Sequence, residues 1–438
     1  MLETLFSIRA QGSTPARETI GGLTTFLTMA YIVVVNPIFL SAAGVPLEGA
    51  LLATCLSAAF GTLLMAFMAN YPIALAPGMG LNAFFAYTIC LGAGIPWQTA
   101  LGLIFWAGIA FVLLTITGAR AMIVRAVPPV LRFAGAVGIG FFIAFIGLQQ
   151  GGLVQGNPHT LLSLGDLRQA PIILSLVGLA ITFALLAKGV RTAIFWGLLS
   201  TLVLGLVTGL VARPEALFSV PQFDLPGFEI DLLGALRLEY LPLVLVILFF
   251  DIFDTLGTLL GIAHEGDFLE EGELPRLDRA MAADSAGTVV GALFGTSTVT
   301  SYIESGAGVG VGARTGFANV VTGSLFLLAP FLAPVIVVVG QGAEGSALTP
   351  VTAPALIAVG SLMVGAVREV DWSDFTEAAP AFVTALTMPL SFNISHGLAA
   401  GIVTFVVVKL SAGRRREVHW LLIAIAALIL LRYALLPV

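Results

Sequence analysis

The sequence from residue 49 to residue 119 reads GALLATCLSAAFGTLLMAFMANYPIALAPGMGLNAFFAYTICLGAGIPWQTALGLIFWAGIAFVLLTITGA, and it contains no Asp, Glu, Lys or Arg. Three further tracts share this property, namely residues 133–165, 315–343 and 378–408. A helix that crosses a bilayer needs about 20 mostly apolar residues, so each tract holds one or more crossings. The apolar runs are continuous rather than alternating, which favours helices over the strands of a membrane β-barrel.

The composition of the whole chain agrees with a protein that lies mostly in lipid. Of its 438 residues, 58% are hydrophobic and 10% are charged, whereas a soluble domain carries roughly 25% charged residues. Cys55 and Cys90 lie in apolar tracts, where we expect them to pack rather than to form a disulfide or bind metal. The first apolar tract is too long for the core of a signal peptide, so we interpret it as the first span.

Fourteen spans are predicted, followed by one further apolar tract. The first seven cover residues 19–43, 49–69, 80–92, 97–117, 132–150, 171–187 and 192–211. The second seven cover residues 240–262, 279–294, 302–313, 317–339, 352–367, 376–391 and 395–410. The remaining tract, residues 418–436, is either a fifteenth crossing or a helix packed against the bundle.

The distribution of Lys and Arg predicts the orientation, because these residues accumulate in short cytoplasmic loops. With a cytoplasmic N-terminus, fifteen lie inside, namely Arg9, Arg17, Arg120, Arg125, Arg132, Lys188, Arg191, Arg276, Arg279, Arg314, Arg368, Lys409, Arg414, Arg415 and Arg416. Three lie outside, namely Arg168, Arg213 and Arg237, and Arg432 falls in the remaining tract. We therefore predict a multi-pass protein of the inner membrane with its N-terminus in the cytoplasm.

The two short spans, 80–92 and 302–313, follow segments with little helical character. Residues 71–80 read YPIALAPGMG, which Pro and Gly interrupt, and residues 295–301 read GTSTVTS, which is rich in β-branched side chains. Both segments are expected to be extended, although ordinary loops between helices are the alternative. Extended backbone at membrane depth is tolerated only where it is buried in protein or lines a cavity.

The two broken spans belong to an internal repeat. Aligning Gly61 with Gly287 places GTLLMA of residues 61–66 on GTVVGA of residues 287–292, and at the same offset Gly78 falls on Glu304 and Gly80 on Gly306. Each broken span is then third in a set of seven, and an odd number of crossings inverts the second set. The predicted fold is an all-α polytopic membrane protein with a 7+7 inverted repeat of 14 transmembrane segments. Paired interruptions of this kind mark the binding site of a transporter.

Four carboxylates lie well inside the predicted spans, namely Asp251, Asp254, Asp284 and Glu304. A charge at the centre of a spanning helix costs about 2.5–3.5 kcal/mol, so each is a candidate for function. Helical spacing puts Asp251, Asp254 and Thr258 on one face. Two neighbouring acids repel in a low dielectric, which favours a proton on one of them. The alternative is a pair of buried acids satisfied by neighbouring helices.

Glu304 opens the second half-helix, where it would accept N–H donors from a planar base or serve only as a helix-start carboxylate. Asn82 begins the other half-helix and either binds substrate or caps the helix. Asp284 lies closer to the end of its span, where a helix-start role competes with function. Phe84 and Phe250 either stack on a ring or pack. Because the sequence has no metal-ligand spacing, phosphate loop or nucleophile motif, we expect no metal, no cofactor and no enzyme activity.

Four stretches give the chain a resemblance to a known family. They are TTFLTMAY of residues 24–31 with Asn36-Pro37, APGMGLNAFF of residues 76–85, FDIFDTLGT of residues 250–258 and GTSTVTSYIES of residues 295–305. These stretches resemble the guanine/hypoxanthine permeases of the azaguanine type. That branch belongs to the nucleobase–cation symporter superfamily, which also contains uracil and xanthine permeases. The resemblance runs from about residue 3 to the end of the chain.

The resemblance implies a core domain, residues 1–117 and 239–340, and a gate domain, residues 118–238 and 341–438, that often forms a homodimer contact. It also implies a substrate or proton carboxylate at Asp251 and Asp254, a substrate-binding glutamate at Glu304 and a third-span asparagine at Asn82. The uracil and xanthine branch has Gln-His where this chain has Thr24-Thr25, and Glu-Asn or Gln-Asn where it has Glu304-Ser305. Both departures argue against uracil or xanthine as the main substrate.

The resulting hypothesis is a secondary transporter that imports purine bases, such as hypoxanthine, guanine or adenine, by proton symport. Glu304 would accept the ring N–H groups, and backbone amides near Phe84 and Ser305 would hold the polar edge. Asp251, beside Phe250, would complete the substrate site, while Asp254, with Asp251 and Glu304, would couple the proton.

The alternatives are a carrier of xanthine or uracil on the same scaffold, or a channel. A membrane enzyme that uses the paired Asp as metal ligands is disfavoured, because no third ligand stands nearby in the sequence. The expected partners are the purine, the proton, the bilayer and a second copy of the chain, with no nucleic acid.

Overall fold

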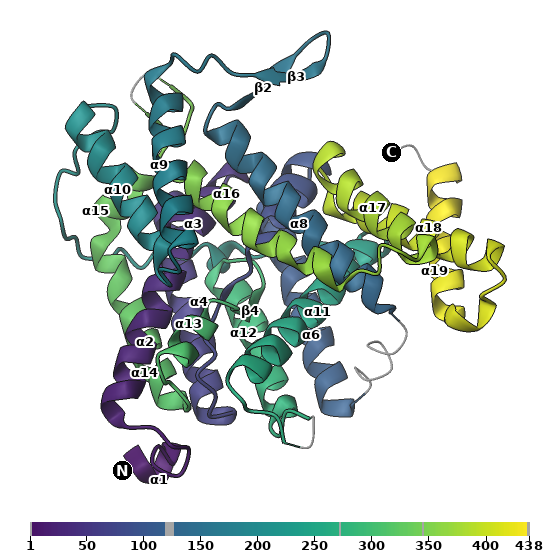
Figure 1. The fold of residues 1–438 in the computed structure, drawn as a ribbon, viewed down its shortest axis with the longest axis horizontal. Helices are drawn as coiled ribbons and strands as arrows, with labels where there is room; N and C mark the ends of the chain where they lie inside the picture. The colour runs from purple at the N-terminus through teal and green to yellow at the C-terminus, as the bar shows by residue number, and fades with distance from the viewer. Residues whose placement is uncertain (1, 119–126, 271–272, 344–345, 436–438) are drawn as a thin grey trace. The chain divides into compact units, whose positions relative to one another are not determined.

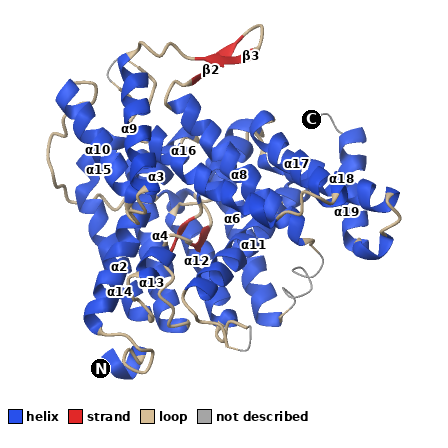
Figure 2. Cartoon of the chain, in the orientation of Figure 1, coloured by secondary structure: helices blue, strands red, loops and turns tan. Residues whose placement is uncertain are grey.

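The computed structural model describes residues 2–118, 127–270, 273–343 and 346–435, so Arg120 and Arg125 of the predicted charge count lie outside the described residues, as does residue 436 at the end of the last apolar tract. The regular secondary structure of the described chain is helical apart from two short strand pairs, and loops connect the elements (Figures 1 and 2). Each of the predicted spans coincides with a helix, or with helices in series, although only part of residues 302–313 is helical.

The first half of the chain contains α1 (Leu2–Phe6), α2 (Pro15–Met29), α3 (Ile32–Ala42), α4 (Leu47–Met68), β1 (Leu75–Pro77), α5 (Met79–Ala83), the π-helix η1 (Phe84–Gly92), α6 (Trp97–Thr117), α8 (Pro129–Gln150), β2 (Val154–Asn157), β3 (Leu161–Leu164), α9 (Ala170–Ala187) and α10 (Ala193–Thr208). The β2–β3 hairpin was not predicted from the sequence; its side chains are mostly exposed.

The second half contains the 3₁₀ turns η2 (Pro226–Glu229), η3 (Gly234–Leu236) and η4 (Leu238–Tyr240), then α11 (Leu241–Glu265), α12 (Leu277–Phe294), β4 (Val299–Ser301), α13 (Ser305–Gly310), α14 (Gly316–Leu328), η5 (Ala329–Leu332), α15 (Ala333–Gly340), α16 (Ala353–Met363), η6 (Val364–Glu369), α17 (Phe375–Leu390), α18 (Ile394–Ser411), η7 (Arg415–Glu417) and α19 (Trp420–Leu435). α19 has 16 residues, so its length is about 24 Å at 1.5 Å per residue. This length is shorter than the hydrocarbon core of a bilayer, which measures about 30 Å.

Eight helices of the described chain are long and apolar enough to cross a membrane. They are Pro15–Ala42, Leu47–Met68, Trp97–Thr117, Pro129–Gln150, Ala170–Ala187, Leu238–Glu265, Gly316–Gly340 and Ile394–Ser411. The shorter apolar helices include Met79–Gly92 and Ala193–Thr208. The chain is therefore a multi-span membrane protein.

The chain divides into two compact units. The first comprises Met1–Ile116 and Gly147–Ala358, and the second comprises Thr117–Ile146 and Val359–Val438. These boundaries rest on backbone packing and differ from the predicted core and gate segments, since residues 118–238 are shared between the units. The core and gate division concerns which parts move together during transport, and it stays a prediction.

The two segments expected to be extended form an antiparallel strand pair inside the first unit. Leu75 lies opposite Ser301, and Pro77 lies opposite Val299. The two strands are drawn in red inside the helices in Figure 2. The alignment that places Gly61 on Gly287 also places Leu75 on Ser301, so one pair of the register joins equivalent positions of the two repeats. Antiparallel pairing of equivalent strands is what a two-fold axis in the membrane plane produces.

A pair of equivalent threonines supports the same symmetry. Thr62 Oγ1 on α4 donates to the Leu75 carbonyl and accepts the Leu75 N–H, both at 2.9 Å. Thr288 Oγ1 on α12, the equivalent position in the second repeat, lies 3.0 Å from the Val299 carbonyl oxygen and accepts the Val299 N–H at 3.2 Å. Each repeat therefore uses the threonine of its second span to satisfy the backbone of its own strand.

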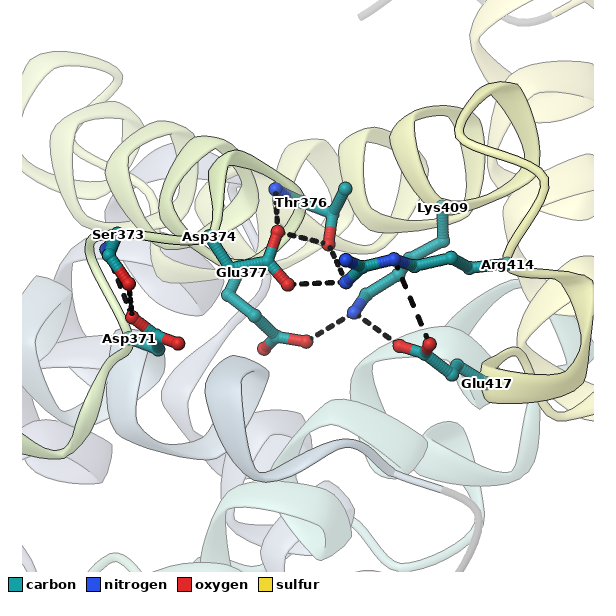
Figure 3. A network of polar contacts seen from close by, with 8 residues as sticks. All are labelled: Asp371, Ser373, Asp374, Thr376, Glu377, Lys409, Arg414 and Glu417. Atoms are coloured by element: carbon teal, nitrogen blue, oxygen red, sulfur yellow. Dashed lines mark hydrogen bonds and ion pairs between the residues drawn. The ribbon is translucent and has the colours of Figure 1, made fainter.

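In the second unit α17 and α18 form a closely packed antiparallel pair. A Cβ at Gly401 would collide with Thr384 Oγ1, so only glycine permits this approach. A cluster of charged side chains joins the start of α17 to the end of α18 (Figure 3). We call it the ion-pair cluster, and its members are Asp374, Glu377, Lys409, Arg414 and Glu417.

Lys409 lies at the centre of the ion-pair cluster, and its side chain is 2% exposed. Its Nζ is 2.5 Å from Glu377 Oε1 and 2.6 Å from Glu417 Oε2. Arg414 pairs with Asp374, which caps α17 by accepting the Thr376 N–H at 2.9 Å. The pKa of Asp374 is lowered to about 2 by the Thr376 N–H and hydroxyl and then by Arg414.

Candidate functional site

The β1–β4 pair lies where backbone groups have no water, so side chains must satisfy them. Asn319 Nδ2 donates to the carbonyls of Tyr71 at 3.0 Å and Ile73 at 2.7 Å. The Ala74 N–H donates to Ser305 Oγ at 3.0 Å, and the Tyr302 hydroxyl donates to the Pro77 carbonyl. Residues from α13, from α14 and from the turn between β4 and α13 therefore hold the extended segment of the other repeat in place.

Several of the predicted site residues serve this same scaffold. Asn82 is fully buried; its Nδ2 donates to the Pro77 carbonyl at 3.3 Å and its Oδ1 accepts from the Ser297 hydroxyl. The Ser305 N–H donates to the Tyr302 carbonyl at 3.1 Å. Phe84 is fully buried, and Phe250 is 6% exposed with its ring against Phe249. In this conformation Asn82 and Ser305 support the strand pair, and Phe84 and Phe250 are packing residues. The contact of these four residues with a substrate stays a prediction.

The four intramembrane acids lie on α11, α12 and at the start of α13. We call Asp251, Asp254, Asp284 and Glu304 the acid cluster. Their side-chain hydrogen-bond partners are hydroxyl groups: Thr288 at 3.0 Å from Asp251, Thr300 at 3.2 Å from Asp254, Thr255 at 2.7 Å and Ser301 at 3.1 Å from Asp284, and Tyr31 at 2.6 Å from Glu304. None of the ion pairs recorded among the described residues involves them.

The acid cluster contains two kinds of environment. Asp251 is 1% exposed and Asp284 is fully buried, and the two carboxylates interact with each other. Asp254 is exposed and Glu304 is partly exposed. Strand β4 contacts both an accessible and a buried acid: Thr300 donates to Asp254, and Ser301 donates to Asp284. Asp254 and Glu304 are thus the accessible pair, and Asp251 and Asp284 are the buried pair.

The two carboxylate oxygens of Asp251 differ in their hydrogen bonds. Its Oδ1 is buried and has no hydrogen-bond partner among the described residues, and its Oδ2 lies 3.0 Å from Thr288 Oγ1. The single proton of that hydroxyl faces two acceptors, Asp251 and the Val299 carbonyl. If Thr288 donates to the strand, as Thr62 does in the other repeat, then Asp251 itself must supply a proton to the contact with Thr288.

Glu304 is positioned by the packing of α2 against α13. A Cβ at Gly308 would collide with Thr25 Oγ1, so glycine is required for this approach. The contact brings the Thr28 hydroxyl to 3.3 Å from the Glu304 carbonyl and the Tyr31 hydroxyl to 2.6 Å from its carboxylate. Tyr31 lies between α2 and α3, where the first span is interrupted.

Sequence reasoning did not assign a role to Tyr31, Thr288 or Thr300, nor to Ser301. The repeat offset pairs Thr288 with Thr62 and could have identified it. Tyr31 ends the stretch TTFLTMAY, but its contact with Glu304 spans 273 residues and has no local signature. Chemically, the site offers exposed acceptors for N–H donors beside buried groups able to hold a proton. Among the described residues, no group of three or more His, Cys, Asp or Glu could hold a metal ion.

Comparison with known proteins identifies the family. The Permease family matches residues 16–400, which is most of the chain. The chain belongs to the Permease family. As a permease, it is a membrane transporter rather than an enzyme, as predicted.

Relatives of this permease extend over nearly its whole length. A putative permease of Methanocaldococcus jannaschii is 45% identical over 99% of this chain and 98% of its own. The guanine/hypoxanthine permease PbuG of Bacillus subtilis is 43% identical over 95% and 96%, and the adenine permease AdeP of Escherichia coli is 40% identical over 99% and 96%. The predicted resemblance to guanine/hypoxanthine permeases is confirmed.

The permease also matches solved structures in fold. The transmembrane domain of the cyanobacterial bicarbonate transporter BicA aligns with 88% of this chain and 97% of its own, with a TM-score of 0.62 and 15% identity. At this identity the likeness concerns the fold alone. It confirms the predicted fold class of an inverted-repeat helical transporter.

Proposed function

We propose that this permease imports purine nucleobases by proton symport. The observation that carries the proposal is the acid cluster, in which exposed carboxylates lie beside buried ones and hydroxyl groups, not cations, are their recorded partners. Carboxylates without a cation can accept N–H donors from a neutral purine and can bind protons. Relatives named guanine/hypoxanthine and adenine permeases support a purine ring and leave its substituents open.

The roles within the site follow from exposure. Glu304 and Asp254 are accessible and would contact the purine. Asp251 and Asp284 are buried and would hold the coupling proton, which the hydrogen-bond inventory at Thr288 supports for Asp251. This exchanges the roles that the sequence suggested for Asp251 and Asp254. Asn82, Phe84, Ser305 and Phe250 would shape the site by fixing its walls.

Proton coupling has a defined energetic consequence. One proton entering down 100 mV supplies about 2.3 kcal/mol, which corresponds to about fortyfold accumulation of a neutral purine before any pH gradient is added. A channel would equilibrate the purine and accumulate nothing, so accumulation separates the two mechanisms.

Uptake by proteoliposomes with an imposed pH gradient tests the proposal. Radiolabelled hypoxanthine, guanine, adenine, xanthine and uracil are compared in the same vesicles, with and without a protonophore and with sodium replaced by potassium. We expect purines to accumulate and the protonophore to abolish accumulation. Uracil as the preferred substrate would refute the purine assignment, and uptake that needs sodium but no proton gradient would refute proton symport.

Orientation and assembly extend the proposal. On the charge distribution and the resemblance, we place the permease in the inner membrane with a cytoplasmic N-terminus, and we propose that it forms a homodimer through the gate domain.

Cysteine labelling tests the orientation. Cys55 and Cys90 are free and buried, so a cysteine introduced at Gly413 reports orientation through a membrane-impermeant maleimide. Labelling in inverted vesicles but not in intact cells is expected; labelling in intact cells would reverse the orientation.

A further inference from the structure

The Tyr31 hydroxyl meets the Glu304 carboxylate across the packing of α2 against α13. It donates to Glu304 Oε1 at 2.6 Å, a short bond of the kind formed with a charged acceptor. Tyr31 is 2% exposed, whereas Glu304 is partly exposed. The hydroxyl therefore holds the carboxylate from the buried side.

We propose that Tyr31 is the positioning residue for Glu304: its hydroxyl holds Oε1, so that Oε2 is presented in a fixed orientation to an N–H donor of the substrate. The inference rests on the proposed function, because it assigns the purine to Glu304. A glutamate has three side-chain torsions, and a ligand that must first order them binds less tightly. With Oε1 held, the carboxylate is already ordered when the substrate arrives.

The packing around Tyr31 keeps the hydroxyl and the carboxylate together. Thr25 of α2 lies against Gly308 of α13, and Gly21 of α2 lies against Ala313, where a Cβ at either glycine would be too close. Thr28 precedes Tyr31 by about one helical turn, and its hydroxyl lies 3.3 Å from the Glu304 carbonyl oxygen. The first span thus contacts both the backbone and the side chain of Glu304, and Tyr31 supplies the contact to the carboxylate.

A double-mutant cycle in proteoliposomes tests this role. Tyr31→Phe removes only the hydroxyl, and we expect it to raise the KM for hypoxanthine about tenfold while the maximal rate stays within about twofold, because a hydrogen bond to a charged group is lost. Glu304→Asp draws the carboxylate back by one methylene, beyond reach of the hydroxyl. In that background Tyr31→Phe should change KM by less than about twofold, since the two residues act as one unit.

Tyr71→Phe is the matched control. Tyr71 is 1% exposed in the same unit, and its hydroxyl accepts the Arg276 N–H at 3.3 Å. This variant also loses a buried hydroxyl that takes part in hydrogen bonding, but its partner is Arg276 and not Glu304. We therefore expect it to lack the KM effect of Tyr31→Phe. Stabilisation of each purified variant by hypoxanthine, measured as a shift in Tm, reports binding independently of reconstitution and identifies any variant that does not fold.

The outcomes separate this inference from the proposed function. If the wild-type protein accumulates purines and Tyr31→Phe leaves KM unchanged, the inference is wrong and the function stands. An equal effect of Tyr31→Phe in both backgrounds would also overturn it, because the hydroxyl would then act independently of Glu304. If the wild-type protein transports no purine at all, the proposed function fails, and the inference fails with it.

Discussion

The acid cluster of α11–α13 and the ion-pair cluster of α17–α18 bring carboxylates together in opposite ways. In the ion-pair cluster Glu377 and Glu417 share the Lys409 ammonium, and Asp374 pairs with Arg414. In the acid cluster the recorded partners are hydroxyls of threonine, serine and tyrosine. A carboxylate beside a fixed cation stays ionised, whereas one beside a hydroxyl, which can donate or accept, exists with or without its proton.

The difference separates a structural use of charge from a functional one. Lys409 ties the start of α17 to the end of α18 and to the chain beyond it, and its side chain is almost fully buried. The acid cluster instead lies along the strand pair where the two repeats meet, and half of it is accessible. Four substitutions test this contrast.

The largest effect is expected from Glu304→Gln. The amide replaces one acceptor oxygen by a donor, which faces the purine N–H and leaves it unpaired. We expect hypoxanthine uptake to fall about 100-fold or more, as for sites built around a specific hydrogen bond. Glu377→Gln in the ion-pair cluster is the control and should keep its uptake. Wild-type uptake by Glu304→Gln would remove this residue from the binding site.

Asp251→Asn tests the buried pair. The amide cannot exchange a proton, so we expect the accumulation of about fortyfold per 100 mV to fall to about onefold, while exchange of labelled for unlabelled hypoxanthine continues. Asp254→Asn should instead weaken binding, because Asp254 is accessible. Gradient-driven accumulation by Asp251→Asn at the wild-type level would place the coupling proton elsewhere.

Lys409→Met tests the ion-pair cluster. Removing the ammonium leaves two carboxylates without a cation, which costs about 3–5 kcal/mol for a fully buried pair. Because Glu417 is half exposed and Glu377 is about a quarter exposed, we expect a loss of about 2 kcal/mol, measured by thermal unfolding in detergent. The KM for hypoxanthine should not change, and Lys409→Arg should retain most of the stability. A changed KM with unchanged stability would contradict a structural role.

Asp374→Asn is expected to have the smallest effect, since Asn still caps α17 and only the charge is lost. The pKa of Asp374 in the folded protein, about 2, lies below its ordinary value of 3.8. Its charge therefore stabilises the fold above pH 3.8, and this contribution is lost as the pH falls through about 2. We expect wild type and variant to differ in Tm at pH 6 and to converge toward pH 2. A difference that persists at pH 2 would contradict this account.

Much of the fold could be predicted from the sequence because insertion into lipid depends on local composition. The charge-free tracts located the spans, and the internal repeat singled out the two extended segments that contain Leu75–Pro77 and Val299–Ser301. The second broken span was placed correctly, but its helix is limited to Ser305–Gly310, shorter than residues 302–313. The Ser305 N–H donates to the Tyr302 carbonyl, and the Ser305 hydroxyl accepts the Ala74 N–H. No local sequence pattern indicates these two contacts.

The candidate site was only partly predictable. Helical spacing places Asp251 and Asp254 on similar faces of α11, yet the first is 1% exposed and the second is exposed. The difference arises from what packs against each of them, α12 with Thr288 in one case and β4 with Thr300 in the other. Spacing along one helix cannot supply that information.

Composition along the chain is enough to show that it spans a membrane many times and that four acids lie within the spans, because the cost of transferring charge and backbone into lipid acts on each segment separately. The internal repeat is likewise visible in the sequence. Which acids are accessible, and which hydroxyl each one meets, depends on how the helices pack. The Tyr31–Glu304 contact joins residues 273 positions apart, and such a contact forms only when helices from both repeats have packed around the strand pair.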